Sequence, residues 1–268
     1  MGQAKRLIET KLLPGGWTDL IRQIALFAGA FMLYDLVRGL VVDGSIYKPF
    51  GDAMKIINFE RAIHIFVEPS VQAWAMNKHW LMDATDWTYL NGHVFVTLAV
   101  LVFIYLRRND SFYFVRNMFM ISMAVALVGY ALYPTAPPRL LPEWGFTDTV
   151  TTAVGQGQAQ TAKLLFNPYA AMPSMHVAFA LMLAVPAFKL ISIRAVRALW
   201  TIYPAFVTFV VVVTANHFWI DGALGALVAA VSAYGAYALG RLRPEAWAWR
   251  TERDSGPPGG GLGAEAPA

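Results

Sequence analysis

Two short polar clusters at the edges of apolar segments contain the residue types that could do chemistry. One is Pro173-Ser174-Met175-His176, and the other is His217 followed four residues later by Asp221. On a helix, positions i and i+4 share a face, so the Asp221 carboxylate is expected to accept a hydrogen bond from one ring nitrogen of His217. The other ring nitrogen then becomes a better nucleophile toward phosphorus, while His176 can protonate a leaving group.

Anion-binding groups accompany the two histidines. Ser174 stands at the predicted start of a helix, where we expect its hydroxyl to cap the first turn and the free amide groups to bind an anion. The prolines within residues 134–138 stiffen the backbone that presents Arg139, whose planar guanidinium matches two phosphate oxygens. The set predicts phosphoryl transfer without a metal or other cofactor. An arginine that only pairs with lipid headgroups is the alternative for Arg139.

Other functions use the same residues or the same scaffold. His176, His217 and Asp221 form a two-histidine, one-carboxylate set that could hold a metal. A serine hydrolase would use Ser174, but a histidine two positions away along a helix points in a different direction. A non-enzymatic lipid-binding membrane protein, such as a transporter, is a third alternative. The other histidines of the chain are expected to be packing residues: His64, His79 and His93.

The elements that position these clusters are predicted to be membrane helices. Of the 268 residues, 57% are hydrophobic and only 14% are charged. Several apolar runs reach the roughly 20 residues needed to cross a hydrocarbon core of about 30 Å. We therefore predict an all-α, polytopic membrane protein with a bundle of six transmembrane helices. The predicted spans are residues 17–42, 89–106, 112–133, 174–190, 195–214 and 218–239.

Lysine and arginine gather at one set of span ends, and this asymmetry predicts the orientation of the chain. By the positive-inside rule both termini are cytoplasmic and the two polar clusters lie at the extracytoplasmic face of the cell membrane. The net charge of +4 follows from the same rule, and no single-face basic stripe indicates nucleic acid. The predicted organisation is a cytoplasmic segment 1–16, a membrane domain 17–240 with outer loops 43–87 and 134–173, and a disordered tail 241–268.

The first outer loop is predicted to contain an additional, interfacial helix. Apolar and charged residues alternate at roughly helical spacing over residues 53–76, which is typical of an amphipathic helix lying on the membrane surface. An anchor that covers the bundle is favoured over a rim that collects lipids. The chain has no cysteine, which excludes disulfides and thiolate catalysis.

Three ordered motifs resemble the type 2 phosphatidic acid phosphatase superfamily. They are the block 167–176, the segment 214–221 followed by Gly225, and the Tyr-Pro-x-Ala-Pro-Pro-Arg segment from Tyr133 to Arg139. The last is similar to the inositol phosphorylceramide synthase branch, an inositolphosphotransferase. The resemblance covers roughly residues 58–239. It implies a six-helix fold, a phospho-histidine formed on His217, orientation of that histidine by Asp221, and His176 as acid and then base.

The same resemblance assigns phosphate binding to Ser174 and Arg139, but two cationic ligands differ. Phosphatase members carry a lysine and an arginine at positions that are Leu132 and Val211 in this sequence. The departure favours transfer of a phosphoryl-containing group from a phospholipid or polyprenyl-phosphate donor to a polyol such as inositol. Hydrolysis with water as acceptor, giving a lipid phosphate or polyprenyl pyrophosphate phosphatase, is the alternative. Possible replacements for the missing groups are Arg61, Lys163 and Tyr133, and Tyr133 is included among the phosphate-binding residues.

Overall fold

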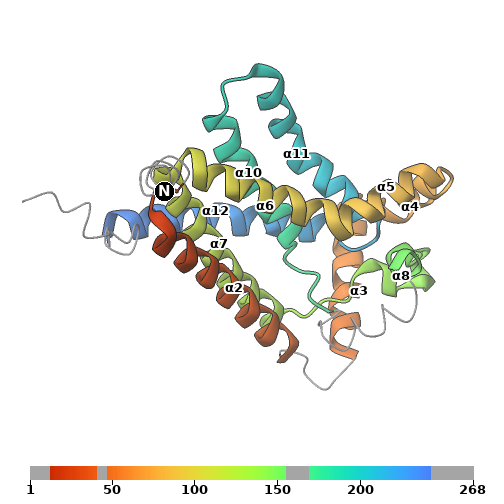
Figure 1. Ribbon diagram of the computed structural model, residues 1–268. Coiled ribbons are helices and arrows are strands. Elements are labelled where there is room, and N and C mark those ends of the chain that lie inside the picture. Colours follow the sequence, from red (N-terminus) through yellow and green to blue (C-terminus); the bar gives the residue numbers. More distant parts are fainter. Residues whose placement is uncertain (1–12, 41–46, 155–168, 243–268) are drawn as a thin grey trace, which may run out of the picture.

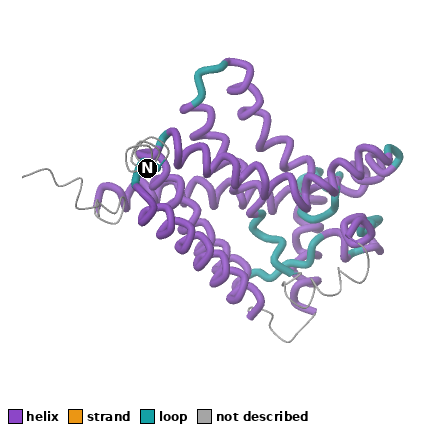
Figure 2. Tube along the Cα trace, viewed as in Figure 1, coloured by secondary structure: helices purple, strands orange, loops and turns teal. Residues whose placement is uncertain are grey.

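The computed structural model of the protein describes residues 13–40, 47–154 and 169–242, and these ranges are helical with short loops (Figures 1 and 2). Several predicted parts lie outside the described residues: residues 1–12 of the segment 1–16, residues 243–268 of the tail 241–268, Lys163, and the start of the block 167–176. The longer helices are α2 (Gly16–Leu40), α3 (Tyr47–Ala62), α4 (Glu68–Met76), α5 (His79–Trp87), α6 (His93–Arg107), α7 (Asn109–Leu132), α10 (Met175–Leu190), α11 (Arg194–Val213) and α12 (Trp219–Leu242). The shorter ones are η1 (Thr88–Gly92), η2 (Pro138–Leu140), η3 (Pro142–Trp144) and α8 (Thr149–Val154).

Five stretches of the described chain are long and apolar enough to cross a membrane. They are Gly16–Arg38, His79–Arg107, Asn109–Leu132, Arg194–Val213 and Trp219–Leu242. The predicted fourth span corresponds to α10, which is apolar but has 16 residues. At 1.5 Å per residue it is about 24 Å long, which is short for a hydrocarbon core of about 30 Å. The all-α, multi-pass prediction is confirmed, and the count of six spans stays a prediction because α10 is shorter than the other five stretches.

The second span starts earlier than the sequence indicates. Helices α5, η1 and α6 form one continuous stretch from His79 to Arg107, whereas the sequence placed residues 43–87 in an outer loop and started the second span at residue 89. One residue of that predicted loop is Asp86, which is buried and accepts a hydrogen bond from the Thr149 hydroxyl at 2.9 Å. Its partner is distant in the sequence, so the hydropathy pattern alone does not show why a carboxylate is tolerated there.

Helix α10 lies at the centre of the packing that positions the site. It packs against α11, α12, α7 and α6, while α12 packs along α7 and α2 covers another side of α7 (Figure 1). One apolar core joins these helices, with Phe119, Met182, Leu183 and Val228 among its buried members. Because α10 and α12 both begin at the same end of this bundle, the two polar clusters meet there.

The predicted interfacial helix is instead two helices with a turn between them. Helix α3 ends at Ala62, and α4 begins at Glu68, where Pro69 in the first turn has no N–H to continue an earlier helix. His64, in the turn, has a φ of 61°. The faces also differ from the expectation, because Glu60 and Glu68 are fully buried while Phe59 is half exposed.

Candidate active site

The contact between His217 and Asp221 forms where a loop meets α12. The Nδ1 atom of His217 lies 3.4 Å from Oδ2 of Asp221, and both side chains are buried. The same Oδ2 accepts a hydrogen bond from the Phe218 N–H at 2.9 Å. The sequence predicted a pair on one helical face, but α12 begins only at Trp219, so Asp221 reaches back from the first turn of the helix. Contacts between catalytic groups are often long without substrate and shorten when it binds.

A tight loop after α11 fixes the direction of the His217 backbone. The N–H groups of Asn216 and His217 both donate to the Val211 carbonyl, at 2.9 and 3.1 Å. Ala215 has a φ of 51°, a conformation that non-glycine residues seldom adopt outside constrained sites. The Asn216 side chain donates to Thr214, which ties the loop together.

His176 lies next to His217, as the sequence predicted for a pair of acid and nucleophile. Their ring centroids are 5.8 Å apart. The His176 ring stacks on Tyr89 at 4.7 Å and lies 4.9 Å from the ring of His93. Tyr89 lies within η1, a single π-helical turn, and His93 follows this turn directly; such turns often occur at functional sites. His93 was expected to be a packing residue, and its contact with His176 becomes visible only in three dimensions.

Ser174 is at the start of α10, but its hydroxyl does not cap the helix. The expectation of a side-chain cap is wrong, because the Ser174 hydroxyl forms no hydrogen bond with the first turn of α10. The Ser174 N–H donates to the Asp221 carbonyl at 3.0 Å. This bond joins the two polar clusters directly. The Oγ atom is buried and has no hydrogen-bond partner among the described residues. A buried hydroxyl without a partner is costly, so a ligand oxygen is a suitable partner for it. Since Oγ is not bonded to a histidine, the serine-hydrolase alternative gains no support.

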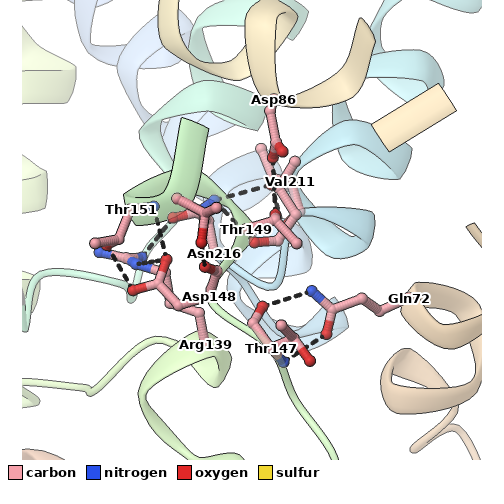
Figure 3. Close-up of polar contacts among 11 residues, drawn as sticks. Gln72, Asp86, Arg139, Thr147, Asp148, Thr149, Thr151, Val211 and Asn216 are labelled. Carbon is pink, nitrogen blue, oxygen red and sulfur yellow. Dashed lines mark hydrogen bonds and ion pairs between the residues drawn. The ribbon is translucent and has the colours of Figure 1, made fainter. Parts of the chain in front are cut away.

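Arg139 is held against the loop that carries His217. Its N–H donates to the Ala215 carbonyl at 2.8 Å, and its guanidinium donates to the Asn216 side chain. Its Nε is also 3.7 Å from Asp148. Figure 3 shows the guanidinium between Asn216 and Asp148, with Thr151 on the other side of Asp148. A guanidinium oriented in this way keeps further N–H donors for a phosphate.

The segment around Asp148 is anchored to two other helices (Figure 3). Gln72 of α4 forms two hydrogen bonds with the Thr147 backbone, at 2.8 and 3.0 Å. Asp86 of α5 accepts from Thr149. These contacts fix Asp148, and therefore the guanidinium of Arg139, relative to the bundle.

Tyr133 and Arg61 have partners away from the two histidines. The Tyr133 hydroxyl donates to the Asp52 carbonyl at 3.4 Å, and burial together with the charge of Asp52 raises the pKa of Tyr133. The Arg61 guanidinium lies over the Trp144 ring at 5.6 Å. A phosphate-binding role for Tyr133 therefore stays a prediction.

Arg38 is a cationic residue near the site that the sequence did not single out. It lies at the end of α2, with its guanidinium 5.9 Å from the centre of the Tyr130 ring. The Tyr130 hydroxyl donates to the Pro173 carbonyl at 3.3 Å, directly before Ser174. The charge of Arg38 acts electrostatically on His176. Only the fold brings the first span to this position, so no sequence spacing could have indicated it.

The two positions that lack cations have different surroundings. Leu132 is 72% exposed on the outside of the bundle, and Val211 is buried under the loop that carries His217. A cation at position 211 would need to displace packing, whereas Arg38 approaches from a separate helix.

A cavity of about 220 Å³ lies beside His176. Residues 87–96 line one side, residues 203–211 of α11 line the other, and the lining is mostly apolar. Trp87 and Phe206 belong to the lining and are themselves largely or partly exposed, so the cavity opens toward the outer surface of the bundle.

A metal centre is not assembled from these groups. Within residues 13–40, 47–154 and 169–242, no group of three or more His, Asp or Glu side chains is arranged to hold a metal ion. The contacts of His176, His217 and Asp221 are those of two neighbouring rings and of a histidine with a carboxylate.

Comparison with models of protein families matches most of the described chain. The model of the PAP2 superfamily matches residues 54–235, which include every described residue of the site except Arg38. Comparisons with curated proteins and with solved structures found no match.

Proposed function

The chain belongs to the PAP2 superfamily, and from this premise we propose that it transfers a phosphoryl-containing group from a membrane lipid through a covalent intermediate on His217. Membership supports a membrane phosphatase or phosphotransferase. The observation that carries the mechanism is the contact between His217 and Asp221 with His176 beside it.

In the first step, Nε2 of His217 attacks the phosphorus of the lipid donor. A bond forms between this nitrogen and phosphorus, and the bond from phosphorus to the leaving lipid oxygen breaks. His176 gives its proton to that oxygen. Asp221 keeps the proton of His217 on Nδ1 and stabilises the positive charge that the ring gains. Arg139 and the Ser174 hydroxyl bind the phosphoryl oxygens.

In the second step, the acceptor oxygen attacks the phosphorus and the bond to Nε2 breaks. His176, now neutral, takes the proton of the acceptor hydroxyl, so both histidines return to their starting states. A polyol such as inositol gives a phosphotransferase of the inositolphosphotransferase type, and water gives a phosphatase.

The apolar cavity suits the lipid part of the donor. It adjoins His176, the group that protonates the leaving oxygen, so the hydrocarbon attached to that oxygen would lie in the cavity. Its exposed edge would face the bilayer and admit a lipid from the side. A phospholipid or a polyprenyl phosphate fits this arrangement.

Arg38 supports the second candidate function, a lipid phosphate or polyprenyl pyrophosphate phosphatase. Two positive ligands expected of phosphatases are replaced by Leu132 and Val211. Arg38, on a different helix, would supply one cation from beside Tyr130, and a second cation in addition to Arg139 would favour a phosphate with two negative charges.

We also propose that α10 completes a six-helix membrane bundle. The outer end of α10 lies beside the start of α12, where the Ser174 N–H bonds to the Asp221 carbonyl. Because α10 is shorter than the hydrocarbon core, the bilayer would need to become thinner around it, or the charged residues at its ends would need to extend to the headgroups. Both termini would then be cytoplasmic and the site extracytoplasmic, in agreement with the distribution of lysine and arginine.

Labelled lipid phosphates test the proposal. Purified protein in detergent is incubated with phosphatidic acid, phosphatidylinositol or a polyprenyl pyrophosphate carrying ³²P, each with and without inositol. We expect acid-labile label on the protein and turnover of at least one donor. With phosphatidic acid or the polyprenyl pyrophosphate, labelled phosphoinositol that forms only when inositol is present identifies inositol as the acceptor, whereas a product without inositol identifies water. With phosphatidylinositol, water as acceptor itself releases phosphoinositol, so that donor reports turnover only. His217→Ala should abolish both the label and turnover. Near-normal turnover by His217→Ala would disprove the mechanism, and His64→Ala provides a matched control outside the site.

A further inference from the structure

The first turn of α12 is held by carboxyl groups from three different helices. The N–H groups of Phe218, Trp219 and Ile220 have no carbonyl acceptor within α12, because these residues precede or begin the helix. Phe218 donates to Asp221 at 2.9 Å, Trp219 to Oε1 of Glu68 at 3.2 Å, and Ile220 to Oε1 of Glu60 at 2.9 Å. Glu60 and Glu68 belong to α3 and α4 and are completely buried.

The second oxygens of Glu60 and Glu68 require a proton. Because Trp219 and Ile220 are consecutive residues, the two carboxyl groups that accept from their N–H groups lie side by side at the start of α12. Within the part of the chain that the structure describes, neither Oε2 atom has a hydrogen-bond donor. Two ionised carboxylates cannot bond to each other, and an unpaired buried charge is strongly unfavourable. One proton between them satisfies both atoms.

We propose that Glu60 and Glu68 share one proton and act as positioning residues, fixing the first turn of α12 and through it the geometry of His217 and Asp221. This inference rests on the proposed function, because it concerns the positioning of its nucleophile. It makes α3 and α4 part of the catalytic machinery, although neither helix touches the reacting atoms.

The electrostatics of the cluster agree with a shared proton. Burial, followed by the hydrogen bond that protonated Glu60 donates to Glu68, raises the pKa of Glu60 from 4.5 to about 9. The titratable groups that face Glu60 are Glu68 from α4 and Asp221 from α12, both acidic. His217 lies beyond Asp221, and the neighbouring Arg61 is turned toward Trp144. Removal of the shared proton would place three negative charges around one helix end.

The connection to His217 is short. Trp219 and Ile220 follow it by two and three positions, and Asp221 completes the same turn. A shift of this turn would lengthen the 3.4 Å contact between His217 and Asp221. Small displacements of a catalytic group can reduce kcat strongly while substrate binding is affected less.

Two substitutions at each glutamate separate positioning from mere packing. Glu60→Gln keeps an oxygen for the Ile220 N–H and an amide donor for Glu68, but it cannot ionise. Glu60→Ala removes the acceptor. At pH 7 we expect Glu60→Gln to retain kcat within about threefold, and Glu60→Ala to lower kcat about 10- to 100-fold with a smaller change in KM. Glu68→Gln and Glu68→Ala should behave in the same way. The assay follows ³²P release from whichever of the three labelled donors named above turns over.

The pH dependence of the unfolding temperature and of kcat tests for the shared proton, because a simple loss of packing would not change it. Because the folded pKa of Glu60 is raised, its protonated form stabilises the fold fully below pH 4.5, and this stabilisation disappears as the pH rises through about 9. The unfolding temperature of wild type should therefore fall relative to Glu60→Gln across this interval. The alkaline loss of kcat should move to higher pH in Glu60→Gln. Asp52 is another buried carboxylate on the same helix, and it pairs with Lys55. The unfolding temperature and kcat of Asp52→Asn should therefore change with pH as those of wild type do.

The unfolding measurement needs no substrate, so it is independent of the proposed function. Superimposable unfolding and activity profiles of wild type and Glu60→Gln would overturn the inference. So would normal kcat in Glu60→Ala while His217→Ala is inactive, since the mechanism would then stand without the pair. Normal turnover by His217→Ala would instead disprove the proposed function, while the unfolding profiles would still decide whether the proton is shared.

Discussion

A single carboxylate, Asp221, has several roles at the residue scale. One of its oxygens faces the His217 ring and the Phe218 N–H, while its backbone carbonyl accepts from the Ser174 N–H. The residue therefore orients the nucleophile and also joins the starts of α10 and α12. The effect of its charge can be tested separately from the effect of its shape, because asparagine has nearly the same shape without the charge.

Asp221→Asn should lower kcat about 100-fold or more and leave KM within a few fold. The amide oxygen can still accept from Phe218, so the helix start is retained. The negative charge that stabilises the imidazolium is lost, and general acid–base and electrostatic assistance of this kind is worth about 10²- to 10⁴-fold. Steady-state kinetics and the rate of ³²P labelling of His217 measure the effect. An unchanged labelling rate in a folded variant would remove Asp221 from the mechanism.

At the scale of elements, the site depends on how closely α12 approaches the start of α10. A Cβ atom built on Gly225 would lie 2.3 Å from the Ser174 carbonyl oxygen, which belongs to the backbone and cannot rotate away. Glycine is required here because of close backbone approach rather than because of an unusual φ. The same helix contains Gly222, where a Cβ would meet side-chain methyl groups of Thr208 and Val177 at 3.7 Å.

Gly225→Ala should move Ser174 and His176 away from His217 and lower both stability and turnover. Overpacking of this kind costs about 1–3 kcal/mol, which lowers the unfolding temperature by several degrees. Gly222→Ala is the matched control, since 3.7 Å is ordinary contact and alanine is the better helix former. Thermal unfolding in detergent and lipid turnover distinguish the two. Equal unfolding temperatures for both variants would contradict the close approach.

At the scale of the whole molecule, the bundle places the chemical groups at one end and basic loops at the other. The loops that follow α7 and α11 meet at the site, where the Arg139 N–H bonds to the Ala215 carbonyl. The loops between α6 and α7 and between α10 and α11 lie at the opposite ends of the same helices. Because the two sets of loops lie at opposite ends of the bundle, labelling one loop of each set shows which end faces the outside of the cell.

Single cysteines can test the orientation without background, because the chain contains none. Glu143→Cys, in the exposed segment after α7, should react with a membrane-impermeant maleimide in intact cells. Ser192→Cys, in the exposed turn between α10 and α11, should react only after the membrane is permeabilised. The expectation follows from the positive-inside rule, since Lys189, Arg194 and Arg197 flank the second position. The reverse labelling pattern would place the site on the cytoplasmic side.

Local chemistry made the central residues predictable from the sequence. The apolar runs indicated an all-α membrane protein because a span needs a continuous stretch of about 20 apolar residues. The pairing of His217 with Asp221 followed from their i,i+4 spacing, and the adjacency of His176 and His217 followed from the prediction that both stand at the same face of the membrane. The motifs around Tyr133 and Asn216 indicated the superfamily that the match over residues 54–235 confirms.

Tertiary structure decided what depends on contacts between distant segments. Glu60 and Glu68 looked like the polar face of a surface helix, but both are buried against the free N–H groups of α12, about 150 residues further along the chain. Arg38 and His93 reach the site because α2 and α6 pack around α7 and α10. The hydropathy of a residue reflects how often that residue type is buried, and it does not indicate which distant residue it will contact. A buried charge is tolerated only when its partner is present, so the partner determines whether it turns inward.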